Sequence, residues 1–219
     1  MPRIFDVLLS ILALFILLPL FIPIIIILFF TGEHKVFYLQ KRVGFKNQDF
    51  KIIKFATMLS NSPNMGSGSL TLKNDPRVLP FGSLLRKTKI NELPQIFNII
   101  IGDLSIVGPR PQMRIDFEKY SKKVQNNIYN VRPGLTGIGS IVFRDEESLI
   151  SIASKNENPH VYYKRVIAPY KGDLELWYKK KKSFSLDLKL IFLTIWVIIF
   201  PKSKIYNYLL DGIPERKYK

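Results

Sequence analysis

The strongest constraint on the fold is an apolar run near the start of the chain. Residues 7–30 contain no charged side chain and are interrupted only by Ser10, Pro19 and Pro23. A straight helix of that length would reach about 36 Å, enough to cross the hydrocarbon core of a bilayer. The run therefore predicts a membrane-associated protein and disfavours an ordinary soluble domain.

Three interpretations of this run stay open. A cleaved signal peptide is disfavoured, because Arg3 and Asp6 precede the run and no small-residue pair marks a cleavage point. A straight span and a helix that enters the bilayer and turns back both fit the pattern. We predict the re-entrant form with both ends on one side, because Pro19 disrupts the helix and a full span would carry Arg3 and Asp6 across the bilayer.

The charge of the chain fits a membrane surface. Lys and Arg number 33 against 17 Asp and Glu, which gives a formal net charge of +16. Basic residues follow the apolar run at once, so the positive-inside tendency places the rest of the chain on the cytoplasmic side, facing anionic lipid. Basic and aromatic residues do not interleave as they do in a nucleic-acid-binding module, and nucleic acid is not expected as a partner.

The side chains available for chemistry are restricted. The chain has no cysteine and two histidines. These counts exclude a disulfide scaffold, a cysteine nucleophile, a zinc site built on thiolates and a histidine-rich metal cluster. Any metal ion must be held mainly by oxygen.

The remaining pattern predicts an α-rich α/β domain. Strands are expected at 36–43 and 50–58 around a turn at 44–49, followed by a long, mobile functional loop at 59–76. Prolines separate helices that we expect near 80–88, 92–101, 112–128, 145–154, 160–167 and 170–183. A second apolar block at 190–200 is too short to span a bilayer, and burial in the core and contact with the membrane surface stay open as alternatives.

The chemistry concentrates in residues 73–111. Asn91 and Pro94 have the form of a helix start, which would offer unpaired backbone N–H groups to an anion. Guanidinium groups bind phosphate bidentately and carboxylates suit Mg²⁺, so a phosphate site is one interpretation and a surface of charges and helix caps is the other. The candidate cations and carboxylates are Arg77, Arg86, Lys87, Lys89, Arg110, Asp75, Glu92 and Asp103.

These residues lie within a longer series of motifs. In order, they are RIFD at 3–6, Pro19, QKRVG at 40–44, KFATM at 54–58, DPR at 75–77, Arg86, ELPQ at 92–95, GDLS at 102–105, GPRP at 108–111 and RPGLTG at 132–137. The series resembles the bacterial sugar transferase family, the monotopic phosphoglycosyl transferases. The resemblance covers nearly the whole chain.

The resemblance implies an enzyme that transfers a sugar-1-phosphate from a UDP-sugar to polyprenyl (undecaprenyl) phosphate, with Mg²⁺ and a covalent phosphosugar on an aspartate. It also implies a monotopic protein of the bacterial inner membrane, with a small cytoplasmic catalytic domain and amphipathic interfacial helices. We accordingly divide the chain into a re-entrant helix at 1–33, a catalytic domain at 34–200 and a C-terminal tail at 201–219. A monomer and a homodimer both stay open, and the pattern does not name the sugar.

Two positions depart from the family pattern. Ala56 stands where the family commonly has arginine, and Asn91 stands where the family has its nucleophilic aspartate. An amide is a far poorer nucleophile than a carboxylate. Three accounts of Asn91 stay open: a deliberate substitution, a natural variant that uses direct transfer or another carboxylate, and lost activity. We favour the active natural variant and take Asp103 as the first alternative carboxylate.

The predicted site follows from these motifs. Catalysis is assigned to Asn91, Glu92 and Asp103, with Glu92 as the Mg²⁺ ligand, and Asp6 and Pro19 are assigned to the membrane segment. Substrate binding is assigned to Lys54, Arg77, Arg86, Arg110, Arg132 and Arg144. The competing function is a catalytically silent member of the family that acts as a membrane-bound scaffold.

Overall fold

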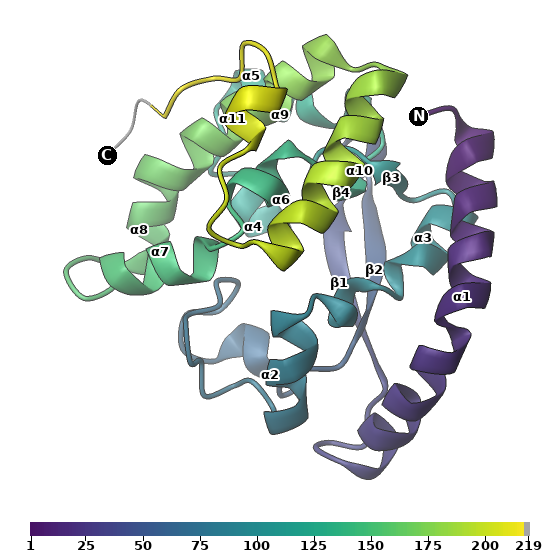
Figure 1. The fold of residues 1–219 in the computed structure, drawn as a ribbon. Coiled ribbons are helices and arrows are strands. Elements are labelled where there is room, and N and C mark those ends of the chain that lie inside the picture. The colour runs from purple at the N-terminus through teal and green to yellow at the C-terminus, as the bar shows by residue number, and fades with distance from the viewer. Residues whose placement is uncertain (217–219) are drawn as a thin grey trace.

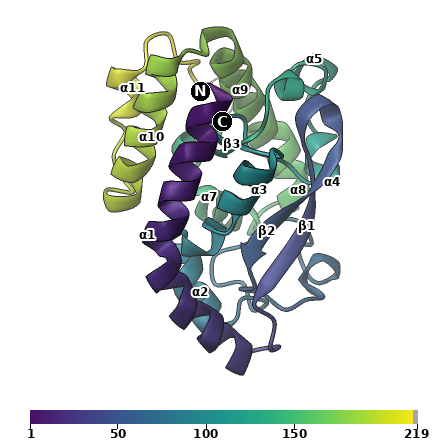
Figure 2. The same ribbon diagram turned by 90° about the vertical axis from the view of Figure 1, so that its right-hand side faces the viewer.

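The computed structural model describes residues 1–216 and shows a helix-rich α/β body with a long N-terminal helix along one side (Figure 1). This helix is α1 (Arg3–Phe30), and Figure 2 shows it in front of the body from a second direction. The strands are β1 (Phe37–Val43), β2 (Asp49–Phe55), β3 (Ser105–Val107) and β4 (Gly134–Thr136). The other α-helices are α2 (Pro80–Lys87), α3 (Gln95–Ile101), α4 (Arg114–Phe117), α5 (Lys122–Gln125), α6 (Ile138–Val142), α7 (Glu146–Ala153), α8 (Pro159–Tyr162), α9 (Ala168–Lys181), α10 (Phe184–Ile199) and α11 (Tyr206–Leu209).

The apolar run forms one continuous helix. Pro19 and Pro23 both lie inside α1, and the helix bends in the half that contains them (Figure 1). Most of its apolar side chains are exposed, and among the described residues α1 is the one helix long and apolar enough to cross a membrane. The bend agrees with the expected effect of Pro19, but α1 does not reverse its direction within itself.

Both ends of α1 are attached to the body. Near the start, the buried Asp6 carboxylate accepts hydrogen bonds from Ser105 Oγ at 2.7 Å and from the backbone N–H of Ile106 at 3.1 Å. Near the other end, Phe21 packs in one apolar cluster with Phe55 of β2 and Leu85 of α2. Asp6 therefore serves to join the helix to the body, because a buried carboxylate needs such partners.

The predicted hairpin is confirmed. Strands β1 and β2 pair antiparallel, with Tyr38 opposite Lys54 and Arg42 opposite Phe50. Alternate residues of a strand share a face, so this register places Tyr38, Arg42 and Lys54 on the same side of the hairpin. That side faces the cavity described below.

The structure also contains a parallel pair of strands that the sequence pattern did not predict, because each strand is only three residues long. Strands β3 and β4 bring the GPRP and RPGLTG motifs together, and Gly108 and Gly134 lie at the contact. A Cβ atom on Gly134 would lie 2.0 Å from the backbone nitrogen of Gly108, so a larger residue cannot fit. The close approach fixes the start of the segment that carries Arg110.

Two helix predictions are wrong in detail. Residues 112–128 form the short helices α4 and α5, and Ser121 caps the second by accepting a hydrogen bond from the backbone N–H of Val124. The expected break at Pro169 is absent, because α8, a π-helical turn at Tyr163–Ile167 and α9 follow one another without interruption. Pro169 lies in the first turn of α9, next to this wider turn.

The second apolar block belongs to α10, which begins before residue 190 because Ser183 caps it. One face of α10 packs in the main core through Leu190 and Leu193. Its outward face remains apolar and exposed, at Phe184, Leu188, Phe192, Ile195 and Ile199. The block is therefore part core and part exposed apolar surface.

The C-terminal segment packs against the same core. Leu210 is buried, and Ile205 and Leu209 contact the core next to it. The last three residues of the predicted tail at 201–219 lie outside the described residues.

Candidate active site

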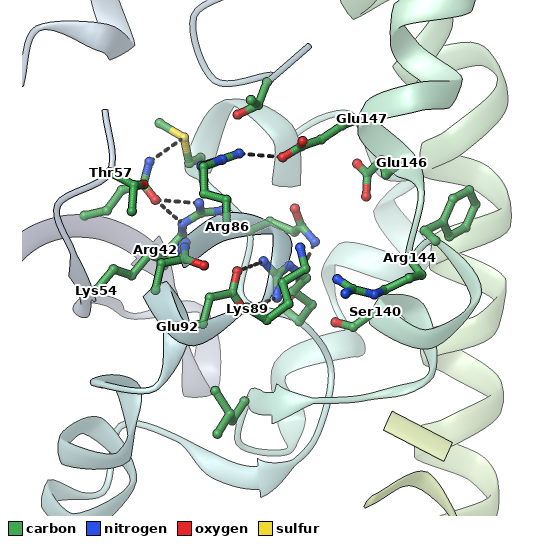
Figure 3. A pocket seen from close by; sticks show the side chains of 18 of the residues that line it. Arg42, Lys54, Thr57, Arg86, Lys89, Glu92, Ser140, Arg144, Glu146 and Glu147 are labelled. Atoms are coloured by element: carbon green, nitrogen blue, oxygen red, sulfur yellow. Dashed lines mark hydrogen bonds and ion pairs between the residues drawn. The ribbon is translucent and has the colours of Figure 1, made fainter. Parts of the chain in front are cut away.

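A cavity of about 420 Å³ opens between the hairpin, the segment around η3 (Ile90–Glu92), the GPRP segment and helices α6, α7 and α10. Figure 3 shows its charged and polar wall. Seven of its lining side chains are basic and four are acidic. The basic residues are Arg42, Lys54, Arg86, Lys89, Arg110, Arg144 and Lys171.

Glu92 and Arg110 form the central ion pair of this wall. Arg110 Nη2 lies 2.7 Å from Glu92 Oε1, and Arg110 Nη1 lies 3.1 Å from Glu92 Oε2, so the pair is bidentate. Burial raises the pKa of the Glu92 carboxyl, but Arg110 and then Lys54 outweigh this effect and hold the pKa well below its usual range. Glu92 is thus an ionised carboxylate surrounded by cations.

The cations around Glu92 exceed the charge that it can neutralise. Burial, followed by the positive charge of Arg42, lowers the pKa of Lys54 well below its usual range. Burial likewise lowers the pKa of Lys89 and of Arg42. The crowding of like charges would be relieved by an anion in the cavity.

Arg86 and Arg144 extend the basic wall toward α7. Arg86 Nη2 lies 2.5 Å from the Glu147 carboxylate (Figure 3). Arg144 Nη2 donates to the Lys87 carbonyl at 3.4 Å, while its Nε is buried without a hydrogen-bond partner among the described residues. The structure therefore brings four predicted binding residues, Lys54, Arg86, Arg110 and Arg144, to one cavity.

Asn91 lines the same cavity but does not cap a helix. It lies within η3, and α3 begins only at Gln95 after Pro94. The prediction of a helix N-terminus at Asn91 is therefore wrong, because the chain first makes a tight turn through Lys89, whose φ is 60°. Asn91 is buried, and its Oδ1 has no hydrogen-bond partner among the described residues.

Asp103 and Arg132 lie outside the cavity lining. Asp103 follows the C-terminal end of α3, and its carboxylate accepts a hydrogen bond from Asn98 Nδ2 at 3.1 Å. Arg132 is exposed and donates to the Gly102 carbonyl at 3.0 Å. Asp103 follows the C-terminal end of α3 and Glu92 precedes its start, so the structure does not bring Asp103 or Arg132 to the cavity that holds Glu92.

Arg77 also has a different role from the one predicted. Its guanidinium is buried, pairs with Asp75 and donates to the carbonyls of the loop at 59–76, at Ser62, Met65, Gly68 and Leu70. Every guanidinium nitrogen is engaged by the protein. Arg77 thus holds the loop that covers one end of the cavity and leaves no nitrogen uncommitted for substrate.

A second set of contacts holds the same loop. Asp116 Oδ1 accepts from Ser69 Oγ at 3.1 Å and from Lys119 Nζ at 2.8 Å. His160 lies 2.8 Å from Lys119 Nζ and 3.1 Å from the Ser67 carbonyl. The expected long loop is confirmed, and it is fixed from two sides.

Several residues of the cavity were not predicted as site residues: Arg42, Thr57, Ser140, Glu146 and Glu147. Lys89, one of the candidate cations, does line it. The alternation of the hairpin could have revealed Arg42, since it shares a strand face with Lys54. No sequence signal points to Ser140, Glu146 or Glu147, which meet the hairpin only through tertiary packing.

The oxygen ligands allow a limited role for Mg²⁺. No group of three Asp, Glu or His side chains that could hold a metal ion occurs within residues 1–216. Mg²⁺ is commonly bound by one or two carboxylates together with substrate phosphates, and each oxygen of Glu92 keeps a lone pair beyond its bond to Arg110. Glu92 therefore fits as the single protein ligand of a substrate-bound ion.

Comparison with known proteins agrees with this geometry. A family model described as bacterial sugar transferase matches residues 1–201. The chain is 39% identical over 160 residues to the exopolysaccharide production protein ExoY of Sinorhizobium fredii, covering 67% of this chain and 70% of ExoY.

Longer alignments are found with two larger proteins. The chain is 31% identical over 196 residues to the UDP-N-acetylgalactosamine-undecaprenyl-phosphate N-acetylgalactosaminephosphotransferase of Aeromonas hydrophila, covering 89% of this chain and 42% of that protein. It is 32% identical over 213 residues to the undecaprenyl-phosphate glucose phosphotransferase of Komagataeibacter xylinus, covering 92% and 36%. It thus spans less than half of these two relatives. With a family model that matches residues 1–201, the protein belongs to the bacterial sugar transferase family.

Proposed function

We propose that this protein transfers a sugar-1-phosphate from a UDP-sugar to polyprenyl phosphate at the cytoplasmic face of the bacterial inner membrane. The observation that carries the proposal is the excess of half-buried cations around the Glu92–Arg110 pair. A pyrophosphate brings the negative charge that this wall lacks, and guanidinium groups bind its oxygens bidentately. The relatives named for UDP-sugars and undecaprenyl phosphate support the same substrate classes.

The reaction can be written without a covalent enzyme intermediate. A phosphate oxygen of the acceptor lipid attacks the β-phosphorus of the UDP-sugar and forms a new P–O bond. The bond from the β-phosphorus to the bridging oxygen breaks, and UMP leaves with that oxygen and its electron pair. In this scheme Arg110 and Lys54 stabilise charge on the transferred group, and the Asn91 amide donates a hydrogen bond to it.

Mg²⁺ belongs to this proposal as the ion that would neutralise pyrophosphate charge when it is bound through Glu92. The chain's own contribution is to keep Glu92 ionised, which the surrounding cations do. We expect activity to be lost in excess EDTA and restored by Mg²⁺ or Mn²⁺. Full turnover after chelation would remove the ion from the proposal.

The contacts of α1 support the re-entrant topology as part of the proposal. Asp6 at its start and Phe21 in its second half both contact the body, so neither end extends away from the catalytic domain. In intact cells, a single cysteine placed at Arg3 should resist a membrane-impermeant thiol reagent. Labelling from outside the cell would instead establish a full span.

A uridine nucleotide release assay tests the function. The protein is incubated with a panel of UDP-sugars, with and without polyprenyl phosphate, and both UMP and lipid product are measured. Direct transfer predicts UMP release only when the acceptor is present. A protein that stays inert with every UDP-sugar would favour the alternative function, a membrane-bound scaffold.

The variant Asn91→Asp separates the accounts of this position. Aspartate would place a carboxylate next to half-buried cations, where the ionised form is favoured and can attack phosphorus. A phosphosugar adduct on residue 91, trapped by mass spectrometry without acceptor, would show that the site is built for a covalent step. If the parent protein is inert and the Asn91→Asp variant is active, direct transfer to the acceptor by the protein with Asn91 would be contradicted.

A further inference from the structure

One part of the cavity wall is apolar, in contrast to the charged part described above. Helix α10 contributes Ile191, Ile195 and Ile198 to the lining, and β4, which packs against α10, adds Leu135. Such side chains offer nothing to a nucleotide diphosphate. They are the surface that a hydrocarbon would contact.

This wall continues to the outside of the molecule. Ile195 and Ile198 line the cavity, yet they are 56% and 40% exposed. Ile195 also belongs to the outward apolar stripe of α10, together with Phe192 and Ile199. An apolar path therefore leads from the interior of the cavity, across one helix, to the exposed apolar surface.

Polar groups without partners lie where this path meets the charged wall. Helix α6 packs against α10 and carries Ser140, and Arg144 follows α6. Ser140 Oγ and Arg144 Nε are both buried and have no hydrogen-bond partner among the described residues. Figure 3 shows both side chains on the side of the cavity away from Arg42 and Lys54. Buried donors in this state indicate a ligand that supplies acceptor oxygens.

We propose that Ser140 and Arg144 bind the phosphate of the acceptor lipid, while its hydrocarbon chain leaves the cavity over Ile195 and Ile198. This inference rests on the proposed function. The cluster of Lys54, Glu92 and Arg110 is then left for the pyrophosphate of the donor. The UDP-sugar has no long hydrocarbon chain, so the apolar exit distinguishes the two substrates.

The proposed apolar exit is tested by varying the length of the hydrocarbon chain of the acceptor lipid. Ile195→Ser and Ile198→Ser are compared with Ile199→Ser, which changes a 62% exposed residue outside the cavity lining. Each is assayed with a long polyprenyl phosphate and with a water-soluble, short-chain prenyl phosphate. Loss of one isoleucine contact with the hydrocarbon chain of the acceptor predicts an increase of about tenfold in the KM for the long acceptor. The short acceptor and Ile199→Ser should show little change.

The head-group assignment has its own test. Ser140→Ala and Arg144→Lys should raise the KM for both acceptors by about tenfold and leave the KM for the UDP-sugar unchanged, since each removes one phosphate contact. Binding of the short acceptor, measured by calorimetry without UDP-sugar, should weaken in parallel. These two readings separate acceptor binding from a general loss of folding.

The outcomes are distinct. Equal effects of Ile195→Ser and Ile199→Ser on the long acceptor would overturn the exit over α10. An unchanged acceptor KM in both Ser140→Ala and Arg144→Lys would overturn the phosphate assignment. Absence of transfer by the unmodified protein with every substrate would instead refute the proposed function, and calorimetry with the short acceptor would still decide whether Ser140 and Arg144 bind a phosphate ester.

Discussion

Glu92 and Glu175 are two carboxylates next to Arg110, and their pKa values shift in opposite directions. Glu175 is buried, and the Glu92 side chain is 14% exposed. Glu92 receives the guanidinium of Arg110 in a bidentate pair, and its pKa lies well below the usual range. Glu175 accepts hydrogen bonds from backbone N–H groups alone: Arg110 donates to its Oε1 at 3.3 Å and Gly139 donates to the same carboxylate, while its Oε2 has no hydrogen-bond partner among the described residues. Burial raises the pKa of Glu175 to about 7.

The difference shows that burial alone does not set the charge of a carboxylate. Lys171 lies near Glu175 but pairs with Glu146 at 2.6 Å, which leaves Glu175 with little compensation. Glu92, by contrast, faces Arg110, Lys54 and Lys89 together. The direction in which the cationic side chains point therefore separates a carboxylate that stays ionised and can bind a cation from one that gains and loses its proton near neutral pH.

The largest expected effect comes from removing the charge of Glu92. Glu92→Gln keeps the size of the side chain and removes its ionised oxygens, so kcat should fall by about 10²–10⁴-fold. Urea unfolding should show a much smaller relative change. An unchanged kcat would mean that Glu92 only balances the charge of its neighbours. The difference in pKa between Glu92 and Glu175 would then be unrelated to catalysis.

A carboxylate–arginine pair outside the cavity sharpens the comparison. Arg77→Met leaves Asp75 buried without its partner and should lower the free energy of unfolding by about 3–5 kcal/mol. Arg114→Met is the matched control, because the Arg114–Asp49 pair is exposed and should contribute less than about 1 kcal/mol. Equal losses in the two variants would contradict the assignment of Arg77 to holding the loop.

The geometry of the Glu92 pair can be tested at constant charge. Arg110→Lys retains the positive charge but not the bidentate fork, so transition-state stabilisation should fall by about 1–3 kcal/mol. The pKa of Glu92 should also rise, which would move the acidic limb of the kcat/KM profile to higher pH. An unchanged profile together with an unchanged kcat/KM would make Arg110 structural.

Glu175 provides the smallest expected effect, with a definite sign. Its pKa is raised in the folded protein, so the stability it contributes is present at low pH and is lost as the pH rises through about 7. Glu175→Gln removes this loss and should be more stable than the parent at pH 8 by about 1–3 kcal/mol, with a smaller difference at pH 5. Thermal unfolding at both pH values measures it, and a variant that is less stable at pH 8 would contradict the raised pKa.

Local patterns predicted the parts of the fold that depend on local physics. Alternating side chains predicted the hairpin that carries Lys54, and the length of residues 7–30 predicted an exposed apolar helix. The break expected at Pro169 failed because a π-helical turn precedes the proline. The strands β3 and β4 were missed because three residues do not establish a period.

The chemical inventory of this protein follows from its amino-acid sequence alone: an apolar N-terminal helix, an excess of basic residues, oxygen ligands for any metal, and the motifs of its family. The tertiary structure decided which of those residues act together. It brought Lys54, Glu92, Arg110 and Arg144 to one cavity and removed Arg77 from it. An arginine in a motif has the same donor groups wherever the motif occurs. Its function depends on whether neighbouring carbonyls and carboxylates already accept hydrogen bonds from those donors, and only the packing of the chain places these neighbours.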